Sequence, residues 1–429
     1  MPNFNSKMLQ SIYQPTMSGP VVVVGGGAAG LMAAGQAAES GAEVILLEKM
    51  RQPGRKISIS GKGRCNLTNA AELSDFLARF GRNGKFLRQC FQQFFNQDLL
   101  RFFEERGLAT VTERGGRVFP AQGKAAEVVA VFRNWLAELP VELRPGSQVE
   151  KLLLENGAVQ GVLCNGQPVM GRAVILAAGG SSYPATGSNG DGCRLAASAG
   201  HSIVPLRPAL VPVETGGNLA ARLAGLHLRN VGVRLLINNK KRADAFGELL
   251  FMKYGLSGPV ILTLSHLMVD ALRAGEAVSV VLDLKPALDE QKLEARLLRD
   301  FAARSKEQMD SVLRGLLPAQ MVPVCLEEIG LAGERLAGEV TAAERKRLRS
   351  WLKAVSLPVT GYRGFKEAII TAGGVSLAEV EPRTMQSKLC KGLYLAGELL
   401  DVQADTGGYN LQAAFSTGWA AGRSAARQA

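Results

Sequence analysis

A run of four valines followed at once by closely spaced glycines constrains this chain more than any other feature. The segment reads Val21-Val-Val-Val-Gly25-Gly-Gly27-Ala-Ala-Gly30. Consecutive β-branched residues predict a strand buried on both faces, and the glycines have the G-x-G-x-x-G spacing of a strand-to-helix turn. There the first glycine permits the bend, the second lets backbone approach a pyrophosphate, and the third lets the helix pack on the strand. The segment therefore predicts an α/β fold with a Rossmann-like dinucleotide-binding domain.

A second apolar strand is predicted after Gly41, and it ends at Glu48. A carboxylate at this position binds the ribose hydroxyls of a dinucleotide. The helix between the two strands starts near Ala28 and Ala29, and its free N–H groups and partial positive charge favour phosphates. The alternative is a glycine-rich turn that binds no ligand. The strand, helix, second strand and Glu48 together favour the dinucleotide site.

Composition restricts the class of protein. The chain has 429 residues, of which 47% are hydrophobic and 21% charged, so it is predicted to be globular with about three domains. No apolar run approaches the roughly 20 residues of a membrane span. Six scattered cysteines without a C-x-x-C pair favour reduced thiols and a cytoplasmic location, and three scattered histidines argue against a zinc site. Residues 1–18 are interpreted as a disordered leader rather than a secretory signal, with Met17 as an alternative start.

Positive charge is unevenly distributed. The net charge is +12, and residues 49–124 hold 15 Lys/Arg against 6 Asp/Glu, a local balance of +9. Such a concentration attracts polyanions such as nucleic acid. The other interpretation is that some of these cations bind cofactor phosphates and the rest are solvated surface. The sequence leaves both interpretations open.

The cationic segment from Gly54 to Asn69 is predicted to be a loop. It is too rich in glycine, serine and cations to be core, its glycines expose backbone N–H groups, and its side chains can hold an anionic or electron-rich ligand. The segment reads Gly-Arg-Lys-Ile-Ser-Ile-Ser-Gly-Lys-Gly-Arg-Cys-Asn-Leu-Thr-Asn. It resembles the signature of the BaiN/RdsA-type bacterial flavoproteins, also described as aminoacetone-oxidase-like FAD-binding enzymes, and the resemblance extends over nearly the whole chain from Val21.

This resemblance implies that the segment wraps FAD, and that FAD rather than NAD occupies the glycine turn. Later segments resemble flavoprotein motifs too, among them the buried strand that ends in Gly179 and the Gly-Asp-Gly turn at Gly190. A helix start after Gly408 would stabilise anionic reduced flavin. The residues assigned to the cofactor are Gly25, Gly27, Ala28, Ala29, Gly30, Glu48, Lys49, Arg55, Lys56, Ser60, Gly61, Gly63, Arg64, Asn66, Val149, Ala178, Gly179, Gly180, Thr186, Gly187, Gly190, Asp191, Gly397, Glu398, Asp401, Gly408, Tyr409, Asn410 and Leu411.

The pattern changes after about residue 205. Antiparallel strands are predicted over 211–236 and 278–284, a helix capped by Ser257 runs to about Leu272, and residues 288–353 are helical. The predicted organisation is an FAD-binding domain of residues 19–205 and 358–429, an inserted β-barrel over 206–286 and a helical subdomain over 287–357. Where the resembled family has Phe-Thr-His before the Ser-Gly-Pro turn, this chain has Met252, Lys253 and Tyr254 after Phe251.

Cys65 is the candidate proton donor for flavin chemistry. It lies between Arg64 and Asn66 in the cationic segment, which could depress the pKa of its thiol. A thiol beside a flavin could protonate the carbon left after hydride transfer to a double bond. The alternative, which the sequence favours, is a small packing residue that helps the segment fold. Lys62 and Arg64 are expected to steady negative charge rather than to transfer protons.

Three functions remain open. The resemblance to RdsA-type members implies an FAD-dependent oxidoreductase that uses NAD(P)H to form dihydrouridine in 23S rRNA. The resemblance to BaiN-type members implies a reductase of a small conjugated enone. A flavoprotein that binds or senses without turnover is the third. No second complete glycine fingerprint for a nicotinamide is present, so the donor is expected to bind transiently.

Overall fold

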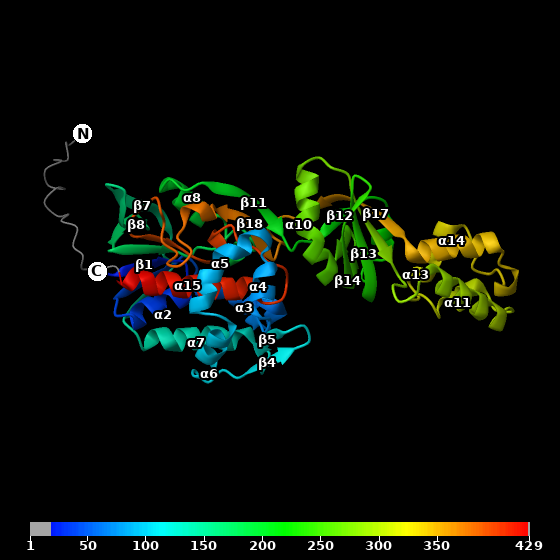
Figure 1. Cartoon of the computed structure of the whole chain (residues 1–429), viewed down its shortest axis with the longest axis horizontal. Coiled ribbons are helices and arrows are strands. Elements are labelled where there is room, and N and C mark those ends of the chain that lie inside the picture. Colours follow the sequence, from blue (N-terminus) through cyan, green and yellow to red (C-terminus); the bar gives the residue numbers. More distant parts are fainter. Residues whose placement is uncertain (1–18, 428–429) are drawn as a thin grey trace. The chain divides into compact units, whose positions relative to one another are not determined.

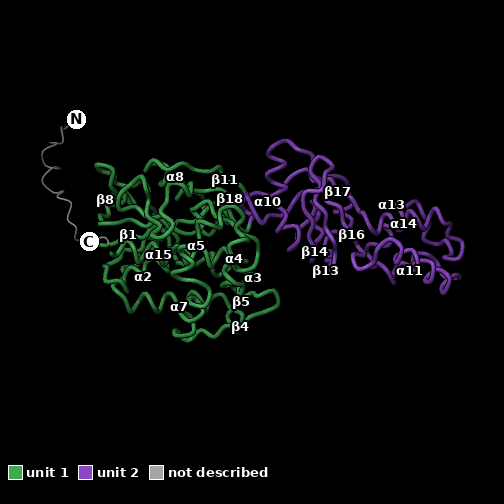
Figure 2. Tube along the Cα trace, viewed as in Figure 1, with its two compact units in different colours: residues 1–207, 369–429 green, residues 208–368 purple. Residues whose placement is uncertain are grey.

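The computed structural model describes residues 19–427 (Figure 1), so the predicted leader over residues 1–18 lies outside the described part of the chain. Two compact units are distinguished (Figure 2). The first combines the chain up to Arg207 with the chain from Ile369 onward, and the second spans Pro208–Ala368. The second unit is thus an insertion between two stretches that fold together.

A parallel five-stranded sheet forms the centre of the first unit. Its order is β19 (Leu393–Leu395), β10 (Ala173–Leu176), β1 (Val21–Val24), β2 (Val44–Glu48) and β6 (Val141–Pro145). The valines of β1 are fully or almost fully buried, because neighbours flank this strand on both edges and helices cover the sheet. The predicted α/β Rossmann-like class is confirmed.

Two helices that are far apart in the sequence pack closely in this unit. α2 (Ala28–Glu39) follows β1, and α15 (Tyr409–Arg427) lies beside it (Figure 1). A Cβ atom added to Gly418 would lie 2.2 Å from the Ala29 carbonyl oxygen, and one on Gly422 would lie 2.3 Å from that of Ala33. Glycine is needed at both positions because the helix backbones touch.

Smaller elements complete the first unit. Phe76, Phe91 and Phe95 pack in an aromatic cluster with Tyr409. The elements are α3 (Arg55–Gly63), β3 (Thr68–Asn69), α4 (Leu73–Ala78), η1 (Gly81–Asn83), α5 (Gly84–Gln93), α6 (Asn96–Glu104), β4 (Thr110–Glu113), β5 (Arg117–Pro120), α7 (Ala125–Ala137), β7 (Val149–Glu155), β8 (Ala158–Cys164), β9 (Gln167–Met170), η2 (Pro184–Thr186), α8 (Asp191–Ser198), β11 (Ile203–Ala209), β18 (Ile370–Val375), η4 (Leu377–Glu379) and η5 (Gly397–Leu399).

The second unit contains a closed antiparallel barrel and a group of helices. The barrel order is β12 (Val213–Thr215), β15 (Gly255–Ser257), β14 (Lys240–Met252), β13 (His227–Ile237), β16 (Val278–Asp283) and β17 (Val355–Tyr362). The helical elements are α9 (Leu219–Arg222), α10 (Pro259–Arg273), α11 (Glu290–Ala303), α12 (Met309–Leu313), α13 (Met321–Ile329), η3 (Ala337–Glu339) and α14 (Ala342–Lys353). The side chains of β13 alternate: Val231, Val233 and Leu235 are buried in its core.

Two details of this unit differ from the sequence-based expectations. Gly258 is the N-cap of α10 and no side chain caps the helix, so the expected cap by Ser257 is wrong; Ser257 instead ends β15, paired with Leu250. The second difference is the end of the inserted region, which was expected at residue 357. Strand β17 closes the barrel between β16 and β12, and the second unit ends at Ala368. Separate folding of a barrel domain and a helical subdomain stays a prediction.

Candidate functional site

The glycine turn has the geometry of a ligand cradle. Gly25 has φ +105°, and a Cβ there would lie 2.6 Å from the Ala177 carbonyl oxygen. A Cβ on Gly30 would lie 1.7 Å from the Gly25 carbonyl oxygen, so only glycine lets α2 start this close to β1. Around Gly27 no heavy atom lies within 4 Å of a Cβ position. The open space at Gly27, in front of the N-terminus of α2, fits a pyrophosphate.

Glu48 is fixed by backbone donors at the end of β2. One carboxylate oxygen accepts a hydrogen bond from the Gly26 N–H at 2.6 Å, and the other accepts from the Met50 N–H at 2.7 Å. The side chain is 9% exposed. Each oxygen keeps a further lone pair, so Glu48 can accept from ribose hydroxyls while it holds the glycine turn to the strand.

The segment from Gly54 to Asn69 is not the loop expected from the sequence. Residues from Arg55 form the helix α3, which Gly54 precedes with φ +74°, and the helical geometry breaks at Ser60, Gly61 and Lys62. The sequence Arg-Lys-Ile-Ser-Ile supports a short helix because Ile57 is buried on its inner face. Lys62 and Gly63 form a left-handed turn after the break.

Arg64 is held by protein partners. Its guanidinium pairs with Glu113 on β4 and lies 4.2 Å from the centre of the Phe119 ring on β5. The hydrogen bond from Arg64 holds the pKa of the Glu113 carboxyl below its usual range. Arg64 thus fastens the segment from Gly54 to Asn69, called the signature segment below, to the β4–β5 hairpin. A contact of Arg64 with cofactor or substrate stays a prediction.

Cys65 differs from expectation in its protonation. Its side chain is fully buried, and this burial raises the pKa of the thiol to about 11. The expected depression is therefore wrong, because Arg64 pairs with Glu113 and the thiol is enclosed. Cys65 adopts φ +58°, and its environment agrees with the packing role that the sequence favoured.

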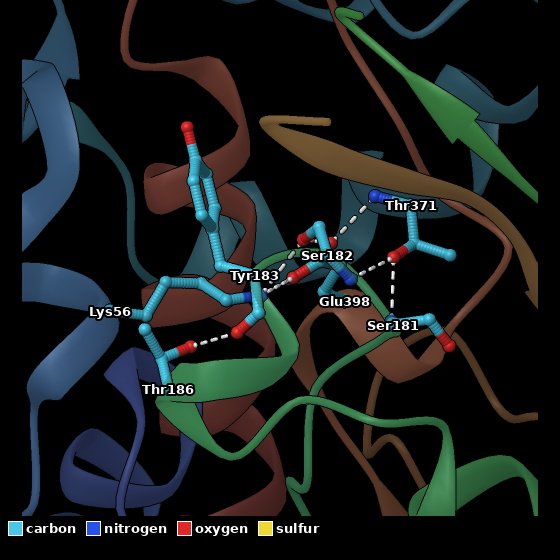
Figure 3. Close-up of polar contacts among 7 residues, drawn as sticks. All are labelled: Lys56, Ser181, Ser182, Tyr183, Thr186, Thr371 and Glu398. Carbon is cyan, nitrogen blue, oxygen red and sulfur yellow. Dashed lines mark hydrogen bonds and ion pairs between the residues drawn. The ribbon is translucent and has the colours of Figure 1, made fainter. Parts of the chain in front are cut away.

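A hydrogen-bonded network joins the ends of three strands of the first unit (Figure 3). The Lys56 ammonium donates to the Glu398 carboxylate at 2.8 Å and to the Ser182 hydroxyl at 2.9 Å. Glu398 also accepts from the Ser182 hydroxyl at 2.8 Å and from the Thr371 N–H at 2.7 Å. Burial alone would raise the pKa of Glu398, but Lys56 and these donors hold it below its usual value. Glu398 is thus a fixed negative charge at the carboxyl edge of the sheet.

The Thr371 hydroxyl completes this network. It accepts from the N–H groups of Ser181 and Ser182 at 2.7 and 3.0 Å. Gly180 permits this contact, because its Cβ position lies 2.4 Å from the same hydroxyl oxygen. Ser182 and Thr371 were missed from the sequence. The signal for Ser182 was its position directly after the strand and its glycines, whereas Thr371 lies in an apolar strand with no local motif.

The chain after β10 folds back onto the end of β2. Lys49 donates to Asn189 at 2.7 Å and to Asp191 at 2.9 Å. Burial would raise the pKa of Asp191, but Lys49 and Arg194 hold it below its usual range. The Cβ position of Gly187 lies 3.0 Å from the Met50 side chain. Gly187 and Asp191 therefore lie beside Lys49 and Met50, directly after Glu48.

The start of α15 approaches the signature segment. The Asn69 amide donates to the Gly407 carbonyl at 3.1 Å, and a Cβ on Gly408 would lie 2.3 Å from the Thr68 carbonyl oxygen. The Asn66 amide, oriented by its neighbours, accepts from the Gly408 N–H at 3.0 Å. Asn66 and Gly408 thus lie together.

The remaining predicted cofactor residues occupy different environments. Asn410 bonds to the Ala404 backbone in both directions at 2.9 Å, and Asp401 accepts from Asn83, so both side chains have protein partners. Arg55 is exposed, whereas Val149 is buried in β7. The others lie in elements already described: Ala28 and Ala29 open α2, Ser60 and Gly61 lie at the break in α3, Ala178 and Gly179 follow β10, Thr186 closes η2, Gly397 opens η5, and Tyr409 and Leu411 lie in the first turn of α15.

The described part of the chain shows neither a membrane-spanning helix nor a metal-binding cluster. Between residues 19 and 427, no helix combines the length and apolar character that crossing a bilayer requires. The same residues contain no group of three or more His, Cys, Asp or Glu side chains arranged to hold a metal ion.

Comparison with known proteins agrees with this geometry. A 3-dehydro-bile acid delta(4,6)-reductase from Clostridium scindens is 35% identical over 409 residues, 95% of this chain and 98% of the relative. A ribosomal RNA dihydrouridine synthase from Escherichia coli is 30% identical, over 93% of this chain and 96% of the relative. The crystal structure of a 3-ketosteroid delta1-dehydrogenase from Sterolibacterium denitrificans matches with a TM-score of 0.52 at 15% identity, over 95% and 99% of the two chains, which shows the shared fold.

The model of the HI0933-like protein Rossmann domain matches residues 19–424. This range includes the glycine turn, the signature segment, the inserted unit and most of α15. FAD is the cofactor that this family and the open cradle at Gly27 support. The chain belongs to the HI0933-like family of FAD-dependent oxidoreductases with a Rossmann domain.

Proposed function

We propose that this protein reduces a uridine of 23S rRNA to dihydrouridine, with FAD as the bound cofactor and NAD(P)H as the transient electron donor. Uracil has a carbon–carbon double bond conjugated to a carbonyl, and so do enone substrates. Bound and reduced FAD can supply a hydride to one carbon of such a bond. The residues around Glu48 and Gly27 would hold the cofactor, and the ion pair of Lys56 with Glu398 would orient the chain that passes it.

The observation that carries the RNA proposal is a surface of exposed cations next to the start of α15. Arg82, Lys85 and Arg88 on η1 and α5 are all exposed, and α5 packs against α15. Arg79 completes the group but lies 3.6 Å from Asp405, so its charge is partly offset. A neutral small substrate gains no binding energy from three solvated cations near the predicted flavin site, whereas a polyanion binds to them through its phosphates. The similarity to the ribosomal RNA dihydrouridine synthase of Escherichia coli supports the same assignment.

Reduction of a small conjugated enone is the second candidate. It is favoured by the higher identity, 35%, to the bile acid reductase of Clostridium scindens. Both candidates use the same flavin chemistry and differ in how substrate is bound. RNA requires contacts outside the flavin site and a base removed from its stack, whereas an enone needs only a site beside the flavin.

Mass spectrometry of ribosomal RNA decides between the candidates. We expect 23S rRNA from a strain lacking the gene to miss one dihydrouridine, and purified FAD-loaded enzyme with NADH or NADPH to restore a gain of about two mass units on one uridine, the two hydrogen atoms of a flavin reduction. Unchanged rRNA in that strain, together with RNA-independent reduction of a 3-oxo-Δ4 steroid, would favour the enone reductase.

A further inference from the structure

We propose that Tyr183 is the proton donor for reduction of the substrate double bond, an inference that rests on the proposed function. Either candidate reaction needs a proton at one carbon after hydride has reached the other. Cys65 was the sequence-based candidate, but it is fully buried with a thiol pKa of about 11. The donor therefore has to be sought elsewhere at the carboxyl edge of the sheet.

The backbone of Tyr183 is strained. It has φ +49° and ψ +64°, the left-handed region that a bulky aromatic residue rarely adopts. Both the amide and the hydroxyl of Thr186 donate to the Tyr183 carbonyl at 2.8 Å and hold this conformation. Strained residues that the surrounding structure over-determines cluster at functional sites. Glycine would adopt this backbone conformation without strain. The presence of tyrosine therefore indicates that its side chain has a role at this position.

The location of Tyr183 suits a group that meets substrate. It follows Ser181 and Ser182, which are anchored by Thr371, and it lies next to the ion pair of Lys56 with Glu398. Figure 3 shows its ring pointing away from these hydrogen-bonded groups. The side chain is partly exposed, and among residues 19–427 none hydrogen-bonds to its phenol oxygen. The ring therefore projects from a rigid base with a free O–H group.

Neighbouring titratable groups are poor donors by comparison. Glu398 has a lowered pKa and carries no proton to give. The Lys56 ammonium is already bonded to Ser182 and Glu398, and losing its proton would leave the Glu398 charge unbalanced. Among the side chains of Lys56, Glu398 and Tyr183, only the Tyr183 phenol carries a proton and takes no part in a hydrogen bond of this network.

The proposed step is balanced in atoms and electrons. As hydride forms a C–H bond at one carbon, the electron pair of the double bond moves toward the conjugated carbonyl. The phenol O–H bond of Tyr183 breaks, its proton forms the second C–H bond, and water returns a proton to the partly exposed phenolate. The substrate gains two electrons, which reduced FAD would supply with the hydride when it is bound.

Tyr183→Phe separates the two halves of turnover. We expect reduction of the flavin by NADPH to be unchanged, while reoxidation of reduced enzyme by deproteinised 23S rRNA or by a 3-oxo-Δ4 steroid slows about 100-fold or more, as for loss of a general acid. The matched control is Tyr362→Phe, which removes a phenol from β17 of the second unit and should behave as wild type. Reoxidation of Tyr183→Phe within twofold of wild type would overturn the proton-donor role alone; failure of the wild type with both acceptors would overturn the proposed function and this role together.

Tyr183→Gly tests the strain without reference to activity. Relief of the left-handed backbone should raise the thermal midpoint of unfolding by about 2–4 °C although double-bond reduction is lost. Most enzyme variants that lose activity through misfolding show a lower midpoint, so a rise is diagnostic. An unchanged or lowered midpoint would contradict the argument that this backbone is held for the sake of its side chain.

Discussion

Glu48 combines a structural and a binding role in one carboxylate. Because Glu48 accepts from the N–H groups of Gly26 and Met50, Glu48→Ala leaves the buried Gly26 donor and the partly buried Met50 donor unpaired. We expect the free energy of unfolding to fall by about 1–3 kcal/mol for the buried donor. FAD retention should fall more strongly than in Glu48→Gln, whose amide oxygen still accepts one bond. The measurement is the flavin-to-protein absorbance ratio after gel filtration, with exposed Glu155→Ala as the control. Equal flavin content in all three proteins would contradict a ribose contact.

His201 predicts a particular pH dependence of stability. It is buried between Glu379 at 3.2 Å and the Ser387 hydroxyl at 2.8 Å, and burial lowers the pKa of its imidazole. The unfolded chain therefore binds the proton first, so the stabilisation is complete above about pH 6.5 and is lost as pH falls below it. Burial alone would raise the pKa of Glu379, but hydrogen bonds from Ser202 and the contact with His201 together hold it below its usual range.

The check is a series of urea midpoints from pH 5 to 7.5. Wild type should lose stability toward pH 5, and His201→Gln, which cannot titrate, should lose part of that slope. Parallel pH profiles for the two proteins would show that His201 has the same pKa folded and unfolded.

At the scale of residues, the sequence was informative where the determinants are local. Gly25, Gly30 and Glu48 belong to one strand–helix–strand unit, so spacing alone predicted the bend at Gly25, the close packing at Gly30 and the position of Glu48 at the end of β2. Their contact with the cofactor stays a prediction. The partners of Lys56 and Arg64 could not be predicted, because Glu398 lies 342 positions from Lys56 and Glu113 lies 49 positions from Arg64. For the same reason the pKa of Cys65 was misjudged: its environment depends on where the neighbouring guanidinium finds its anion.

At the scale of elements, the contact between α2 and α15 leads to a prediction about packing. Gly418→Ala would place a methyl group where the Ala29 carbonyl oxygen lies only 2.2 Å away, so α15 has to move off α2. We expect a loss of about 1–3 kcal/mol in unfolding free energy from overpacking. We also expect weaker FAD binding, because α2 follows the glycine turn that is predicted to bind the pyrophosphate. Gly364→Ala, where no atom lies within 4 Å, is the control. Equal thermal midpoints for the two variants would contradict the close packing.

Elements with strong periodicity were also predictable. The strands β1, β2 and β10 and the helix α2 form as expected. The signature segment was misjudged because its glycines and cations suggest a loop, whereas the single buried side chain of Ile57 anchors a helical turn. The burial of Ile57 against the rest of the unit stabilises a helical turn in a segment whose composition favours a loop.

At the scale of the whole molecule, uneven charge predicts how RNA binding responds to salt. Arg82, Lys85 and Arg88 changed together to Gln should leave the flavin spectrum intact and reduce the slope of log K against log salt by up to about 2–3, if each cation meets one phosphate. The control removes three exposed cations elsewhere in the first unit: Arg133, Lys151 and Lys391. If both triple variants lose equal slope, RNA responds to net charge and not to this surface.

The order of the sheet also has a consequence for biosynthesis. β10 pairs with β19, and α2 packs on α15, although residues 208–368 are translated between these partners. While the ribosome makes the insertion, β10 lacks its neighbour β19, and the alanines of α2 lack the helix α15 that buries them. The inserted unit can complete its own barrel first, since domains fold as units during synthesis. A nascent chain stalled before residue 393 should therefore contain a folded insertion and an unfinished sheet that captures no flavin.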